Sequence, residues 1–140
     1  MRAVQYSLAE DLGSGDITAE LVDEQVMSAA HLFVRQPAVI CGVQWVNEVF
    51  RQVGEGVDID WQVSEGDEVG AETLLAVFSG PARLLLTGER CALNWLQTLS
   101  GVATEVRRVV SLIAGSNARI LDTRKTIPGM RLAQKYAVTV

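Results

Sequence analysis

57-VDIDWQVSEGDEVGAETLLAVFSG-80 alternates apolar and polar residues over two runs, with a turn at residues 65–67 between them. This alternation around a glycine-containing turn predicts two antiparallel strands, each with one face toward a core. Pro81 follows at once and suits the first turn of a helix. From Pro81 to about Leu99 the apolar residues recur at helical spacing, so we expect a helix directly after the sheet.

Helices and strands also precede this hairpin. The stretch 42-GVQWVNEVFRQVG-54 has apolar residues at helical spacing, which predicts an amphipathic helix that ends at Gly54. The dense, β-branched residues 26–40 predict a strand, a proline bend and a short strand. Residues 5–22 are expected to form a helix, a Gly-Ser-Gly turn and a second short helix capped by Asp16.

The remaining residues have a different order of elements. Gly101 is expected to separate the helix after Pro81 from another helix over residues 103–114. Residues 118–123 are predicted to form a strand, and a further helix is expected after Gly129. The predicted fold class is α+β: an antiparallel sheet with helices, leading into the first strand and helix of a truncated α/β barrel.

We expect two domains, an N-terminal α+β domain at residues 1–100 and an incomplete α/β barrel at 101–140. A strand and helix without their partner strands cannot cover their apolar faces, so we expect the chain to be a fragment.

Composition narrows the class of protein. At 140 residues and 49% hydrophobic, the chain can bury a core, and it has no apolar run long enough to span a membrane. We expect a soluble, cytoplasmic protein. A net charge of −5 argues against nucleic-acid binding. We expect Cys41 and Cys91 to be reduced core thiols and His31 to be a packed residue, which leaves too few ligands for structural zinc.

Positive charge gathers at the end of the chain. Residues 119–140 carry five basic and one acidic residue, a net +4, whereas residues 1–118 carry a net −9. Within 121-LDTRKTIPG-129, Arg124 suits bidentate binding of a carboxylate or phosphate, and Lys125 acts as a point charge. Thr123 adds a hydroxyl donor. The alternative is that both cations pair only with solvent or exposed carboxylates.

Arg90 is the second candidate for anion binding. It lies on the polar face of the predicted helix and follows Glu89, so an ordinary surface ion pair is the alternative. The acidic residues Asp11 and Asp16 fit helix capping better than a metal cluster. No phosphate-binding glycine loop, zinc-protease motif or serine-protease set is present.

Three stretches together resemble the quinolinate phosphoribosyltransferase family, also called nicotinate-nucleotide pyrophosphorylase (carboxylating): 10-EDLGSGDIT-18, 88-GERCALNWLQTLSGVAT-104 and 121-LDTRKTIPGMRLAQKYAV-138. The resemblance covers essentially the whole chain, and the family continues after KYAV with the rest of a type II phosphoribosyltransferase barrel. It implies transfer of phosphoribose from phosphoribosyl pyrophosphate to quinolinate with decarboxylation, giving nicotinate mononucleotide, pyrophosphate and CO₂ in NAD biosynthesis.

The resemblance also implies roles for individual residues. Thr123 and Arg124 would contact quinolinate, and Lys125 would be catalytic and reach toward phosphoribosyl pyrophosphate. Arg90 would bind quinolinate in the neighbouring subunit's pocket, so the active form would be a homodimer. The family's Mg²⁺ would be held by carboxylates outside this chain, so we expect no metal ligands here and no turnover by these residues alone.

The sequence alone does not exclude other classes of protein. A related type II phosphoribosyltransferase-like protein of the molybdenum-transport type shares the expected fold, and a non-catalytic dimerisation module is a further possibility. A biotinyl or lipoyl carrier would need a lysine at the tip of the hairpin in residues 63–80, and this region has none.

Overall fold

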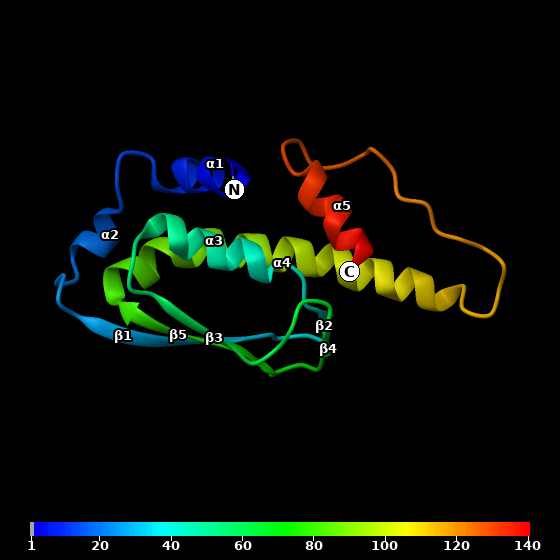
Figure 1. Cartoon of the computed structure of the whole chain (residues 1–140), viewed down its shortest axis with the longest axis horizontal. Helices are drawn as coiled ribbons and strands as arrows, with labels where there is room; N and C mark the ends of the chain where they lie inside the picture. Colours follow the sequence, from blue (N-terminus) through cyan, green and yellow to red (C-terminus); the bar gives the residue numbers. More distant parts are fainter. Residues whose placement is uncertain (1) are drawn as a thin grey trace.

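An antiparallel sheet packs against a pair of helices in the computed structural model, which describes residues 2–140. Figure 1 shows α3 and α4 across one face of the sheet, with α1 and α5 on the far side of these helices. The predicted mixed α+β class with an antiparallel sheet is therefore confirmed. The helices are α1 (Arg2–Leu12), α2 (Ile17–Glu20), α3 (Val43–Val53), α4 (Ala82–Leu112) and α5 (Arg131–Thr139). The strands are β1 (Met27–Phe33), β2 (Ala38–Val39), β3 (Asp58–Trp61), β4 (Glu68–Val69) and β5 (Leu74–Pro81).

The second strand of the predicted hairpin, β5, is the central strand of the three-stranded sheet. β5 pairs with β3 on one side and with β1 on the other, both antiparallel. The turn also forms where expected, because the Ser64 amide donates to the Asp67 carboxylate at 2.8 Å. However, β4 directly after the turn pairs with β2 instead of β3, so the hairpin is interrupted by a separate two-stranded ribbon.

α4 is one continuous helix of 31 residues, and the predicted break at Gly101 is wrong. The apolar stripe continues across this position, because Leu99 and Ala103 on either side are both buried. A glycine inside a helix costs only about 1 kcal/mol relative to alanine, which such packing offsets. The helix thus runs through the predicted boundary between residues 100 and 101, and the division into two domains stays a prediction.

The predicted strand at residues 118–123 is also wrong. This segment has no regular secondary structure, and Ile120 and Leu121 are exposed. A strand needs a neighbour for its backbone hydrogen bonds, and within residues 2–140 no strand lies beside it. Residues 113–130 therefore form a long irregular connection from α4 to α5 (Figure 1).

The core extends from the sheet through the α3–α4 pair to the buried faces of α1 and α5. Val46 and Val49 of α3 meet Leu96 and Leu99 of α4, and Phe78 of β5 closes the core from the sheet side. Full burial of such a side chain contributes roughly 1.5–3 kcal/mol. Throughout the described residues, none of the helices has the length and apolar character to cross a membrane.

Two hydroxyls of α4 complete the hydrogen bonds of the segment around β2. Ser100 Oγ accepts from the Cys41 amide at 3.0 Å and donates to the Cys41 carbonyl at 3.1 Å. Thr104 Oγ1 accepts from the Val39 amide at 2.8 Å. Buried backbone groups need such partners, so these side chains fix the short ribbon to the helix.

The predictions for the two cysteines are confirmed, whereas the prediction for the histidine is wrong. Cys41 and Cys91 are buried free thiols, as predicted. His31 is exposed, so its assignment as a packed residue is wrong. It belongs to β1, an edge strand whose residues are mostly exposed, and its ring stacks on Phe33 with centroids 6.4 Å apart.

Candidate functional site

Arg90 lies in the N-terminal third of α4 and pairs with an acidic residue near the start of the sequence. Its Nη1 donates to Asp11 Oδ1 of α1 at 3.0 Å, while 74% of the Arg90 side chain stays exposed. The alternative reading, an ordinary surface ion pair, is thus partly met, but the partner lies 79 residues away in the sequence and not within the same helix. This contact uses one Nη1 hydrogen bond, and the exposed remainder of the guanidinium keeps donors for an anion.

A second acid of the same motif lies close by. Asp16 caps α2, as predicted, because its Oδ1 accepts from the Ala19 amide at 3.0 Å. That bond, a hydrogen bond from the Thr87 hydroxyl and the charge of Arg90 all lower the pKa of Asp16. The motifs 10-EDLGSGDIT-18 and 88-GER-90 thus lie together, although the sequence separates them widely.

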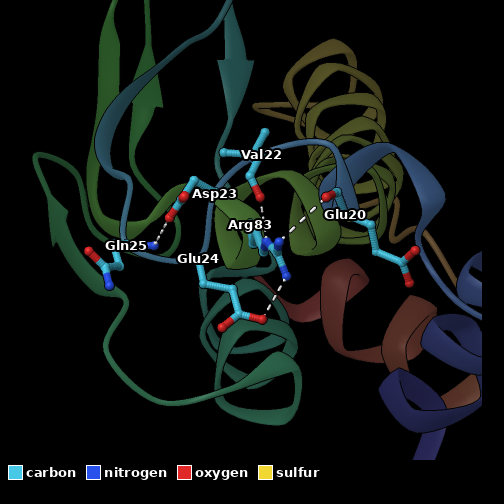
Figure 2. A network of polar contacts seen from close by, with 6 residues as sticks. All are labelled: Glu20, Val22, Asp23, Glu24, Gln25 and Arg83. Carbon is cyan, nitrogen blue, oxygen red and sulfur yellow. Dashed lines mark hydrogen bonds and ion pairs between the residues drawn. The ribbon is translucent and has the colours of Figure 1, made fainter.

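Arg83 fastens the connection after α2 to the start of α4. Figure 2 shows its guanidinium at the centre of the network. Its Nε donates to the Val22 carbonyl at 2.6 Å, and its Nη2 donates to the Glu20 carbonyl at 3.4 Å. Nη1 pairs with Glu24 at 3.0 Å. Arg83 thus ties the end of α2, the helix that Asp16 caps, to the same helix that carries Arg90.

Arg90 and Asp11 border a groove of about 640 Å³ between α1, α4 and the loop before α5. Trp95 forms part of its wall and donates from Nε1 to Ser7 Oγ at 2.8 Å. Residues 127–130 also line the groove. The groove therefore joins Arg90 to the loop that follows the basic pair, and it has room for a small molecule.

The residues Thr123, Arg124 and Lys125 lie exposed in the irregular connection. The Lys125 amide donates to Thr123 Oγ1 at 3.2 Å, which gives the segment a local turn. Among residues 2–140, no acidic side chain pairs with the Arg124 or Lys125 side chain. The chain does not bring these three residues into the groove of Arg90, so their joint site stays a prediction.

Glu65 has a role that the sequence pattern did not reveal. Its carboxylate accepts from the Gly42 and Val43 amides, both at 2.9 Å, at the start of α3. A negative charge is favourable at a helix N-terminus. Burial, aided by the charge of Glu65, raises the pKa of Cys41 to about 12 and also raises the pKa of Tyr136 in α5. The Cys41 thiol therefore stays protonated at neutral pH.

Glu65→Ala is expected to lower the free energy of unfolding by about 1 kcal/mol, because two amides at the start of α3 lose their acceptor. Urea unfolding followed by circular dichroism measures the change. Glu55→Ala is the control, since Glu55 is exposed and its side chain makes no hydrogen bond or ion pair within residues 2–140. Its effect should stay below about 0.5 kcal/mol, and an equal loss in both variants would contradict the capping role.

Comparison with known proteins covers nearly the whole chain. Residues 16–100 match the quinolinate phosphoribosyl transferase N-terminal domain, and residues 102–140 match the C-terminal domain of the same family. A probable nicotinate-nucleotide pyrophosphorylase (carboxylating) of Synechocystis is 38% identical over 96% of this chain and 45% of its own length. Its counterpart in Bacillus subtilis is 34% identical over 98% of this chain and 47% of its own.

A solved structure agrees with these relatives. The nicotinate-nucleotide pyrophosphorylase of Francisella tularensis matches with a TM-score of 0.94 and 43% identity, over 99% of this chain and 50% of that one. These matches place the chain in the phosphoribosyltransferase class. The chain belongs to the quinolinate phosphoribosyltransferase family. It spans about half the length of the curated relatives that it matches.

Proposed function

We propose that this chain supplies part of the substrate site of a cytoplasmic enzyme that transfers phosphoribose to quinolinate with decarboxylation, in NAD biosynthesis. The observation that carries the proposal is the family match over residues 16–100 and 102–140. The relatives are named for this activity, as carboxylating pyrophosphorylases or decarboxylating quinolinate phosphoribosyltransferases. The charge of the substrates agrees, because two carboxylates and three phosphate groups call for the net +4 of residues 119–140.

In this reaction the ring nitrogen of quinolinate attacks C1 of phosphoribosyl pyrophosphate. The bond from C1 to oxygen breaks, and its electron pair leaves with pyrophosphate. The ring then loses the neighbouring carboxylate as CO₂, and the ring carbon takes up a proton. Nicotinate mononucleotide is the product. Cations placed near the leaving pyrophosphate stabilise the charge that develops there.

The proposed roles follow the chemistry of each side chain. Arg124 grips a quinolinate carboxylate with its planar fork, and the Thr123 hydroxyl donates to the same substrate. Lys125 is the catalytic cation and reaches toward the pyrophosphate. Neither cation is engaged by an acidic side chain of the described residues, so neither must first break an ion pair.

Arg90 is proposed to act in the partner subunit of a homodimer. Its side chain is 74% exposed and points from a rigid helix beside a groove, which suits a residue that extends into a second copy. Asp11 would orient the guanidinium without consuming all its donors.

Family members are expected to use Mg²⁺, which would neutralise pyrophosphate charge. Among residues 2–140, no three histidine, cysteine, aspartate or glutamate side chains gather into a metal site, and the carboxylates that would hold Mg²⁺ are expected outside this chain. Carboxylate oxygens are the protein ligands that Mg²⁺ prefers. We derive no step of the reaction through the metal from this chain.

Isothermal titration of the chain with quinolinate tests the proposed site. We expect saturable binding, with nicotinate binding more weakly because it lacks one carboxylate. Binding should weaken as salt is added, since the contacts are between ions. No binding of quinolinate would overturn the proposed site, and equal affinity for nicotinate would remove the two-carboxylate recognition from it.

The 140 residues by themselves are expected to form no detectable nicotinate mononucleotide from quinolinate and phosphoribosyl pyrophosphate with Mg²⁺. The reason is that the chain spans about half the length of its relatives, and the resemblance places the Mg²⁺ carboxylates in the part of the barrel that it does not cover. Chromatography of the reaction mixture measures the product, with a full-length family enzyme as positive control. A clear rate from the purified chain would contradict this expectation.

A further inference from the structure

α5 is packed against the core and lies beside the irregular connection at residues 113–130. Ala133 and Ala137 are buried against the core, and Tyr136 packs on Trp45 with ring centroids 5.3 Å apart. The opposite side of the helix faces residues 122–127, which lack regular structure. Any contact from α5 to that segment therefore joins a fixed element to a weakly held one.

Two side chains of α5 make such contacts. Lys135 Nζ donates to the Asp122 carboxylate, and this hydrogen bond lowers the pKa of Asp122. Gln134 Oε1 accepts from the Ile127 amide at 2.6 Å. The two anchored positions, 122 and 127, lie on either side of Thr123, Arg124 and Lys125.

We propose that Lys135 and Gln134 are positioning residues: from α5 they hold both ends of residues 122–127 and so place Thr123, Arg124 and Lys125 for an anionic ligand. This inference rests on the proposed function for the identity of the ligand. The anchoring itself rests only on the two contacts. It assigns Lys135 an internal partner, so this lysine does not join Arg90, Arg124 and Lys125 as a further cation for the substrate.

Amide hydrogen exchange of the ligand-free chain tests the anchoring. In Lys135→Met and in Asp122→Asn we expect residues 122–127 to exchange about fivefold faster, as suits the loss of a half-exposed ion pair. The double variant should be no faster than either single one, because both remove the same contact. Lys135→Arg should keep the slow exchange, and the urea midpoint for the whole chain should not move.

The matched control is Arg108→Met, which removes the exposed pair between Arg108 and Glu105 on α4. It should leave exchange at residues 122–127 unchanged. Unchanged exchange in Lys135→Met, or an equal rise in Arg108→Met, would overturn the anchoring. Gln134→Leu checks the second anchor independently, with the increase expected at the Ile127 amide.

Quinolinate titration then tests whether the ligand uses this placement. The dissociation constant should rise about threefold in Lys135→Met and return in Lys135→Arg. Faster exchange with an unchanged dissociation constant would overturn the positioning role. If the unmodified chain does not bind quinolinate, the proposed function fails, and the exchange pattern alone still decides the anchoring.

Discussion

Gly88→Ala is expected to lower the free energy of unfolding by about 2 kcal/mol, although the change adds a single methyl group. A Cβ at this position would lie 2.6 Å from Cε1 and 2.9 Å from Cδ1 of Phe50. Phe50 is 5% exposed, and its ring packs on Phe78 with centroids 5.2 Å apart, so it has little space to retreat. Urea unfolding followed by circular dichroism measures the loss.

Gly101→Ala is the control in the same helix. Nothing lies within 4 Å of a Cβ at Gly101, so this variant should gain about 0.5–1 kcal/mol from higher helix propensity. Adding Phe50→Leu to Gly88→Ala should recover part of the loss by opening space. If both glycine variants behave alike, close packing does not explain Gly88. The first residue of the Gly-Glu-Arg motif would then owe its presence to something other than the approach of α3 to α4.

The sequence pattern correctly predicted those helices and strands that depend on nearby residues. Asp16 was expected to cap α2 and Gly54 to end α3, and both do. The antiparallel pairing of residues 58–61 with residues 76–79 followed from alternation. The two helix ends depend on the chemistry of a few neighbouring residues. The strand pairing depends on the apolar face of each strand, which must pack against the core.

Long-range contacts were beyond the sequence pattern. β4 pairs with β2, whose segment is also hydrogen-bonded to Ser100 and Thr104 of α4. The spacing along residues 57–80 gives no sign of this pairing. Asp11 was expected to serve helix capping, yet it binds Arg90. Such pairs depend on how the helices pack in the folded chain. The family resemblance therefore identified Arg90 as a candidate residue but did not identify its ion-pair partner, Asp11.

Arg124→Ala is expected to weaken quinolinate binding by at least about 30-fold, which corresponds to about 2 kcal/mol, and so to abolish a measurable titration. The guanidinium can make two parallel hydrogen bonds to one carboxylate, and alanine replaces neither. Two unit charges about 4 Å apart attract by roughly 4 kcal/mol at an effective dielectric near 20. Isothermal titration under the conditions used for the unmodified chain measures the change.

The same irregular connection offers a control that separates a specific contact from general attraction. Arg119 is also exposed, and Arg119→Ala changes the net charge equally at five positions' distance from Arg124. If quinolinate is held by a fork, only Arg124→Ala abolishes binding, and Arg124→Lys restores part of it because lysine keeps the charge without the geometry. If the basic segment merely attracts anions, both alanine variants weaken binding by the same small factor relative to the unmodified chain. Added salt should then make the affinities of the variants and the unmodified chain equal. An unchanged affinity in Arg124→Ala would take this residue out of the site and leave Lys125 as the nearest cation to test.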